Sequence, residues 1–257
     1  MSDWNPAHYA QFSDVRMRPA LDLLARVPDL PPGAVIDLGC GNGSIGPALK
    51  QRFDRRDRMG VDNSPAMLTA AMGTGAYTAT MNANINTWDP ETPPALIYSN
   101  AALHWLPDLA SLLPRLAGKI TPGGTLAVQV PHQNGAPSHR LWLDLVQTHF
   151  PGRFDPAKAP GIPETVEFFD ILNDLGTLSL WETEYYQHLP AQTQGHPVRQ
   201  FTSSTFARPV LDVLAEDEQT FITTIYDEAV SAAYPLRPDG TALFPFRRLF
   251  FTLTLPT

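Results

Sequence analysis

Apolar residues in the first half of the chain form short continuous runs, separated by stretches in which apolar positions recur at helical spacing. Continuous runs of this kind predict buried strands, and the spaced stretches predict amphipathic helices. We expect strands at 34–38, 59–62, 96–99 and 125–130, and helices at 14–27, 44–53, after Ser64-Pro65 and at 106–116. Alternation of strands and helices is typical of βαβ units, so the pattern predicts an α/β fold with a parallel sheet.

The second half of the chain has a less regular pattern. Helices are expected at 139–150 and 164–175, the latter capped by Gly176, and strands at 177–186 and 246–255. An acidic, mostly helical region lies between these two strands, at roughly 190–240. In an α/β fold, such a long insertion is expected to cover a site and not to extend the sheet. Because no shift in composition marks a boundary, we expect one domain with a cap.

The charge balance narrows the possible partners. The 257 residues carry a formal net charge of −8, and residues 133–257 hold most of the acidic excess. Nucleic acids and anionic membranes require basic surfaces, so neither is expected as a partner. Nearly all of the basic residues are arginines, which suit bidentate recognition of a carboxylate or phosphate. A small anion bound by a few arginines therefore remains compatible with this acidic chain.

Several other classes of protein are not expected. The single cysteine, Cys40, excludes a disulfide framework and a Cys-rich zinc site. The histidines show no ligand spacing with carboxylates, so no metal is expected. The first residues lack the basic and apolar regions of a signal peptide, and no apolar run approaches the ~20 residues of a membrane span. We therefore expect a cytoplasmic protein.

The glycine-rich segment at 35–46 carries the main chemical signal. Glycines between a strand and a helix allow a ligand to approach the backbone, and the helix start offers free N–H groups. The stretch Gly41–Gly46 matches G-x-G-x-x-G, which on its own permits a nicotinamide dehydrogenase. However, Asp37 precedes the glycines, where it would repel a pyrophosphate and would suit a ligand with a positive centre. Asp62, at the end of the next strand, can accept hydrogen bonds from both hydroxyls of a ribose.

These residues resemble a known family. The segment at 35–43, Gly60-Val61-Asp62 and the segment at 121–126 together resemble class I S-adenosylmethionine-dependent methyltransferases. The segments at 1–13, 100–108, 234–236 and 246–250 are similar, more narrowly, to the trans-aconitate methyltransferases. The resemblance implies a doubly wound, mostly parallel, seven-stranded Rossmann-like sheet with a helical cap. It also implies transfer of a methyl group from S-adenosylmethionine to a carboxylate of a small polycarboxylic acid, with trans-aconitate as the best candidate.

The resemblance divides the chain, as one methyltransferase domain over 1–257, into parts with different tasks. It implies an N-terminal lid and first helix at 1–30 and a cofactor-binding core at 31–131. It also implies a substrate cap at about 132–165 and 190–240, and two final strands at 177–186 and 246–255. In the core, it implies that Gly39 and Gly41 admit the methionine part of the cofactor and that Asp62 binds the ribose. The other cofactor residues expected are Arg18, Asp37, Cys40, Asn63, Met67, Asn84, Ile85 and Asn100. Two positions depart from the family pattern, which usually has Asp at Asn84 and often has an acid at Ala95.

A carboxylate acceptor would require anion-binding groups and no general base, because a carboxylate is already ionised at neutral pH. Arg247 and Arg248 are the main candidates to bind it, and His104 would act as a base only for a hydroxyl or amine acceptor. The expected substrate residues are Tyr9, His104, Trp105, Tyr186, Arg208, Arg247 and Arg248.

Other interpretations remain open from the sequence. One is a methyltransferase of the same family with another small acceptor, such as a secondary-metabolite acid or a hydroxyl. The second is a non-catalytic S-adenosylmethionine-binding protein, and the third is the nicotinamide dehydrogenase. In the main interpretation the partner is a small anionic substrate, and the protein is a monomer or a weak homo-oligomer.

Overall fold

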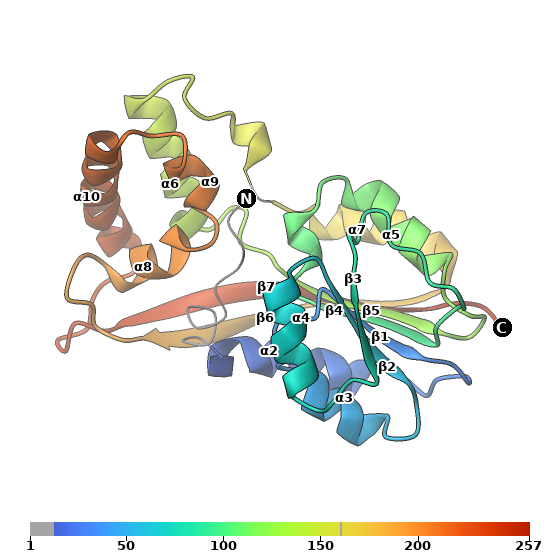
Figure 1. Ribbon diagram of the computed structural model, residues 1–257. Helices are drawn as coiled ribbons and strands as arrows, with labels where there is room; N and C mark the ends of the chain where they lie inside the picture. The colour runs from blue at the N-terminus through green and yellow to red at the C-terminus, as the bar shows by residue number, and fades with distance from the viewer. Residues whose placement is uncertain (1–12, 160) are drawn as a thin grey trace. The chain divides into compact units, whose positions relative to one another are not determined.

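The computed structural model describes residues 13–159 and 161–257. A seven-stranded sheet has the order β3-β2-β1-β4-β5-β7-β6 (Figure 1). All strand pairs from β3 to β5 are parallel, and β7 is antiparallel to β5. The strands are β1 (Val35–Leu38), β2 (Arg58–Asp62), β3 (Ala79–Asn82), β4 (Leu96–Asn100), β5 (Thr125–Pro131), β6 (Thr177–Leu189) and β7 (Ala242–Thr254). The predicted parallel α/β fold is therefore confirmed.

The chain divides into two compact units. Unit 1 comprises the chain up to Pro131, Pro163–Thr183 and Arg248–Thr257, and unit 2 comprises His132–Ile162 and Glu184–Arg247. The helices of unit 1 are α2 (Ser13–Arg26), α3 (Gly46–Arg52), α4 (Pro65–Gly73), α5 (Leu109–Ala117) and α7 (Thr165–Leu172), with 3-10 turns η1 (Leu103–Trp105) and η3 (Asn173–Leu175). Those of unit 2 are α6 (Pro137–His149), α8 (Pro197–Ser203), α9 (Arg208–Leu211) and α10 (Glu216–Ala233), with the turn η2 (Pro156–Lys158).

The helices of unit 1 cover both faces of its sheet, with α2 and α3 on one face and α5 and α7 on the other (Figure 1). This double cover explains why every residue of β1 and the first four of β4 are buried, and hence why these strands read as continuous apolar runs. Strand β3 differs, because it lies at the sheet edge and none of its residues is fully buried. Its short polar sequence gave no apolar run to predict it.

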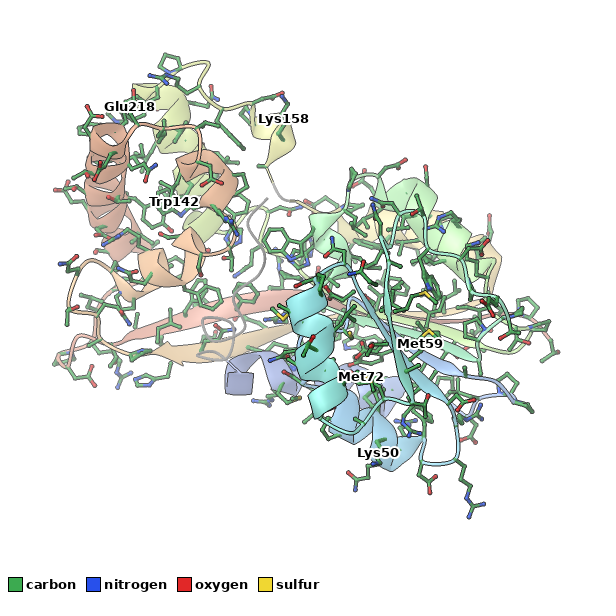
Figure 2. All side chains as sticks on the ribbon, in the orientation of Figure 1. Lys50, Met59, Met72, Trp142, Lys158 and Glu218 are labelled. Atoms are coloured by element: carbon green, nitrogen blue, oxygen red, sulfur yellow. The ribbon has the colours of Figure 1, made fainter. Side chains whose placement is uncertain are left out.

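The core of unit 2 is aromatic. The Trp142 and Tyr226 rings stack with centroids 3.9 Å apart, which joins α6 to α10. Trp142 Nε1 donates to Thr202 Oγ1 at 3.0 Å, and Tyr226 Oη donates to the Ser138 carbonyl at 2.8 Å. Trp142 lies among the helices of this unit (Figure 2). The hydrogen bonds satisfy the polar ends of rings that are otherwise fully buried.

Many arginines in unit 1 hold backbone carbonyls. Arg52 donates to the carbonyls of Leu24 and Val27, and Arg56 to those of Leu30, Pro31 and Gly33. The buried Arg58 side chain likewise donates to several carbonyls, including that of Ala76 at 2.8 Å. The guanidinium group has five N–H donors, so one side chain can satisfy several loop carbonyls at once. The arginines therefore stabilise the fold through hydrogen bonds to loop carbonyls, and only some of them are available to bind an anion.

Gly176 ends the helical segment at the predicted position, as the C-cap of η3, but with a different backbone conformation. Its φ of 167° is extended backbone and not the left-handed conformation of many glycine caps. A Cβ atom at this position would lie 2.3 Å from the Thr254 carbonyl oxygen. Glycine is needed here for the close approach of the β7 end.

No helix among residues 13–159 and 161–257 is long and apolar enough to cross a membrane. The same described residues contain no group of three or more His, Cys, Asp or Glu side chains that could hold a metal ion.

Candidate functional site

The glycine loop follows β1, and its glycines have different surroundings. Gly39, Gly41 and Gly43 all have positive φ angles, which favour glycine. A Cβ atom on Gly39 would lie 2.3 Å from Ala102 Cβ, and one on Gly43 would lie 2.8 Å from Ala71 Cα. At Gly41, in contrast, a Cβ atom would meet nothing within 4 Å among the described residues. The loop therefore packs closely against its neighbours but leaves the backbone of Gly41 accessible to a ligand.

Asp62 connects the end of β2 to this loop. Its Oδ2 accepts a hydrogen bond from the Gly41 N–H at 2.9 Å, and its Oδ1 accepts one from the Ser64 N–H at 3.0 Å. Ser64 also caps α4, because its side chain accepts from the Met67 N–H, and Met67 is buried. Each oxygen of a carboxylate can accept two hydrogen bonds, so both Asp62 oxygens retain one site for a ligand. The carboxylate is thus fixed in a geometry that suits two adjacent hydroxyl groups.

Asp37 is buried beneath the loop. The Tyr77 hydroxyl donates to its Oδ2 at 2.5 Å, from a residue 40 positions further along the chain. Burial raises the pKa of Asp37 to about 7, while the Tyr77 hydrogen bond lowers it and the charge of Asp62 raises it further. Its titration is therefore moved from the acidic range towards neutral pH. A positive group nearby would favour its charged form.

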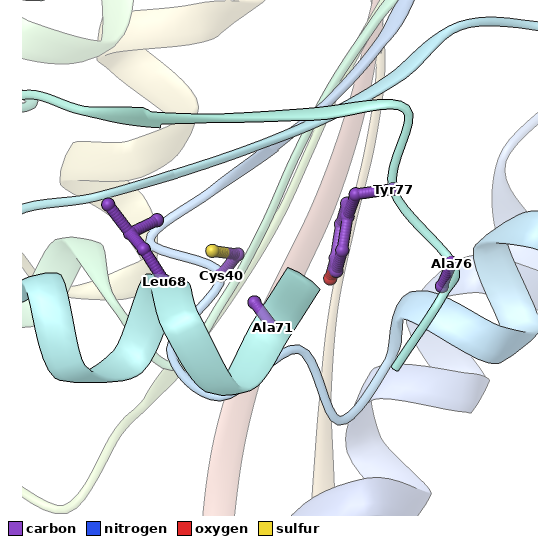
Figure 3. Close-up of a cluster of buried hydrophobic side chains, with 5 residues drawn as sticks. All are labelled: Cys40, Leu68, Ala71, Ala76 and Tyr77. Atoms are coloured by element: carbon purple, nitrogen blue, oxygen red, sulfur yellow. The ribbon is translucent and has the colours of Figure 1, made fainter. Parts of the chain in front are cut away.

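Cys40 packs beneath the loop in a small apolar cluster with Leu68, Ala71, Ala76 and Tyr77 (Figure 3). Burial raises the pKa of its thiol, with the charges of Asp37 and Asp62 adding to the effect. The Cys40 N–H donates to the Val61 carbonyl at 3.0 Å. These contacts make Cys40 a packing residue, because a reactive thiol requires access and a lowered pKa.

The predicted adenine residues lie on the loop between β3 and β4. Asn84 is exposed, and its Oδ1 accepts from the Asn86 N–H at 3.0 Å. Ile85 Cδ1 would lie 3.6 Å from a Cβ atom on Gly39, so the loop approaches the glycine segment. Arg115 of α5 holds the loop by donating to the carbonyls of Ile85 and Trp88, at 2.7 and 3.0 Å. Asn63, another predicted adenine residue, is exposed after β2.

The end of β4 combines a strained backbone with an orphaned polar atom. Ala101 has a φ of 53°, a conformation that costs a non-glycine residue about 1–2 kcal/mol. No hydrogen-bond partner reaches the buried Oδ1 of Asn100 from within the described residues. Strain and unpaired buried atoms of this kind gather at functional sites. This geometry favours the prediction that Asn100 faces the ligand.

Ala95, which departs from the family pattern, is fully buried just before β4. A Cβ atom on Gly33 would lie 2.9 Å from its backbone nitrogen, and one on Gly124 would lie 2.8 Å from its carbonyl oxygen. The two close approaches explain why glycines occupy positions 33 and 124, on either side of the Ala95 backbone.

The remaining predicted residues of unit 1 are spread over three segments. His104 and Trp105 lie in η1, with ring centroids 4.7 Å apart, and Trp105 is exposed. Arg18 is exposed on α2, whereas Tyr9 lies outside the described residues. Their roles stay predictions.

The two consecutive arginines on β7 have different environments. Arg248 is only 3% exposed, and its Nη1 donates to Gln129 Oε1 at 3.2 Å. Arg247 is exposed, and its Nε donates to the His132 carbonyl at 3.3 Å. Consecutive residues of a strand point to opposite faces, so only one of the pair can serve a buried site in this region.

Unit 2 carries two further predicted substrate residues. Tyr186 is 64% exposed on β6, and Arg208 begins α9, where its Nε lies 4.0 Å from Asp212 Oδ2. An exposed ion pair of this kind contributes little to stability. Their roles also stay predictions.

Comparison with known proteins identifies the family. Residues 8–160 match the family model described as a methyltransferase domain. A trans-aconitate 2-methyltransferase of Methylobacterium radiotolerans is 40% identical over 257 residues, which covers 97% of each chain. The chain belongs to the methyltransferase family. The protein of the same name from Escherichia coli (strain 55989 / EAEC) is 38% identical over 252 residues, again with 97% of each chain covered.

Solved structures with low sequence identity share the fold of this methyltransferase. The YcgJ protein of Bacillus subtilis has a TM-score of 0.60 at 15% identity, covering 93% of this chain and 99% of that one. A phosphoethanolamine N-methyltransferase of Haemonchus contortus, in complex with phosphomonomethylethanolamine and S-adenosylhomocysteine, has a TM-score of 0.57 at 14% identity. It covers 93% of this chain and 53% of that one. The predicted methyltransferase family and Rossmann-like sheet are confirmed, and the dehydrogenase alternative is set aside.

Two residues that contact predicted site residues escaped prediction from the sequence. Tyr77 follows an ordinary turn, and nothing in the sequence connects it to Asp37. Gln129 did leave a signal, because it is the one amide in the otherwise apolar run at 125–130.

Proposed function

We propose that this methyltransferase transfers the methyl group of S-adenosylmethionine to a carboxylate of trans-aconitate. The observation that carries the proposal is the identity of 38–41% to trans-aconitate 2-methyltransferases over 97% of the chain. Because the similarity spans nearly the whole chain, it includes the residues of both units. The acceptor is a small molecule; a cytoplasmic location and a monomeric or weakly associating state remain sequence-based predictions.

The described residues fit the cofactor. Gly41 leaves its backbone open, Asp62 offers two oriented acceptor oxygens, and Asn100 has an orphaned acceptor at the end of β4. We assign the ribose hydroxyls to Asp62 and the methionine part to Gly39, Gly41 and Asn100. The loop at Asn84 and Ile85 would hold the adenine. Asp37 would favour a positive charge on the ligand.

The bound cofactor supplies a methyl group already activated by its sulfonium. The acceptor carboxylate has a pKa near 4 in water and is ionised at neutral pH, so no residue has to remove a proton. The protein must instead align the carboxylate with the methyl carbon and exclude water. His104 has no required role as a base in this scheme. Arg248, buried and close to Asn100 in the sheet, is the proposed anchor for the anionic acceptor.

The proposal is tested by a labelled-methyl transfer assay with di- and tricarboxylic acids and hydroxyl-containing acceptors. We expect methyl-ester formation with trans-aconitate at the highest kcat/KM. The pH–rate profile should show no essential group near pH 6.5 that disappears in His104→Ala. Preferred transfer to a hydroxyl acceptor, or cofactor binding without transfer to any acid, would reject the proposal.

A further inference from the structure

Gln129 lies in the fully buried part of β5 and is 0% exposed. Its register partners are Asn100 on β4 and Phe250 on β7. Arg248 precedes Phe250 by two residues, so the Gln129 and Arg248 side chains lie on the same face of the sheet. Their hydrogen bond, from Arg248 Nη1 to Gln129 Oε1, joins β5 to β7.

This hydrogen bond fixes the orientation of the Gln129 amide. A guanidinium group can only donate, so the amide oxygen must face Arg248. The amide nitrogen must then point away from Arg248. No acceptor among the described residues reaches Nε2 of Gln129, although the side chain is completely buried. Leaving a buried donor unpaired destabilises a fold, so a residue of this kind is typical of a binding site.

The amide lies next to the end of the cofactor core. Asn100 occupies the neighbouring register position, and the Ala101 N–H donates to the Gln129 carbonyl at 2.9 Å. Ala102 in turn approaches Gly39 of the glycine loop. On the face of the sheet where Asn100 presents an acceptor, Gln129 therefore presents a neutral N–H donor and Arg248 presents a cation. A donor and a cation together suit a carboxylate.

We propose that Gln129 is a specificity-determining residue that, with Arg248, binds a carboxylate of the acceptor other than the one that is methylated. The inference rests on the proposed function, because it requires an acceptor with at least two carboxylates. A carboxylate held by charge-assisted hydrogen bonds gives its lone pairs to those donors and is a weaker nucleophile. The group bound here thus positions the acceptor and leaves a different carboxylate free to react.

The decisive variant is Gln129→Glu. It keeps an oxygen for Arg248 but replaces the amide nitrogen by a second oxygen, which repels a carboxylate. Gln129→Met removes the donor without adding charge and serves as a second variant. In both, we expect the KM for trans-aconitate and its Kd, measured by calorimetry on protein saturated with S-adenosylhomocysteine, to rise at least tenfold. The kcat should stay within about threefold and the Kd for S-adenosylhomocysteine within about twofold.

Thr125→Val is the matched control, because Thr125 is also fully buried on β5 but lies at its amino end, with its Oγ1 3.2 Å from Thr254 Oγ1. It should leave the KM unchanged. An unchanged trans-aconitate Kd in both Gln129 variants, or a change confined to kcat, would overturn the inference. An equal rise in the S-adenosylhomocysteine Kd would also overturn it, since the methionine carboxylate would then be the ligand. Binding that depends on Gln129 without methyl transfer would reject the proposed function, and would leave Gln129 only as a residue that binds a carboxylate.

Discussion

At the scale of single residues, the glycines after β1 have two different roles: some allow close packing and one allows a ligand to approach. Gly39 and Gly43 are required by close neighbours, whereas a Cβ atom on Gly41 would meet no atom of residues 13–159 or 161–257 within 4 Å. All three share a positive φ, so the backbone conformation alone does not distinguish them. The G-x-G-x-x-G match is therefore a poor guide to which glycine a ligand approaches.

This difference predicts the effects of two matched substitutions. Gly41→Ala and Gly75→Ala both place a Cβ at a positive φ, 53° and 64°, with nothing within 4 Å in the described part of the chain. Each should lower the free energy of unfolding by about 1–2 kcal/mol, measured by urea denaturation. Only Gly41→Ala should also weaken S-adenosylhomocysteine binding, by at least tenfold in calorimetry. Equal affinities in the two variants would show that no ligand approaches Gly41.

At the scale of elements, the arginines connect loops to helices. The clearest case is Arg115, which links α5 to the loop that contains Ile85 and Trp88. The loop itself has few buried residues, with Trp88 as the main exception. Its conformation therefore depends on donors from outside, and Arg115 supplies two of them.

Arg115→Ala should loosen this loop. We expect faster amide exchange at 85–88, a loss of about 1–3 kcal/mol in unfolding free energy, and several-fold weaker S-adenosylhomocysteine binding. Lys119→Ala is the control, because Lys119 pairs with Asp89 near the same loop but through an exposed ion pair. It should cost less than about 1 kcal/mol. If the two variants exchange at the same rate, Arg115 does not hold the loop.

The elements also show what a sequence can and cannot predict. The strands at 35–38 and 125–131 were predictable because burial on both faces requires continuous apolar residues. Strand β3 was not, since an exposed edge imposes no such pattern. The Tyr77–Asp37 hydrogen bond was equally hidden, because only the fold brings together residues 40 positions apart. Gln129 was visible as an exception within an apolar run, but its orientation depends on Arg248 across the sheet.

At the scale of the whole molecule, the buried Asp37 connects folding to pH. Its folded pKa of about 7 lies above the ordinary value of 3.8, chiefly through burial. The folded state therefore retains a proton that the unfolded chain releases. The stabilisation is complete below about pH 4 and is lost as the pH rises towards and through 7.

Asp37→Asn should remove this dependence, since an amide oxygen can still accept from Tyr77. Without cofactor, the unfolding free energy of the wild type should fall relative to the variant between about pH 4 and 7. The relative loss should reach at most about 4 kcal/mol and level off at higher pH. Chemical denaturation of both proteins across this range tests the effect. Parallel curves would mean that Asp37 does not retain its proton in the folded protein.

Cys40, the only cysteine in the sequence, is closed off beneath α4 by Leu68 and Ala71. A thiol reagent can therefore modify Cys40 in the native protein only after this segment opens. The rate of modification then reports the rate at which the region around the glycine loop opens. The same shielding means that a second cysteine placed on the surface would be labelled selectively without first removing Cys40. The packing of one side chain thus makes the wild-type chain a convenient starting point for attaching a single spectroscopic probe.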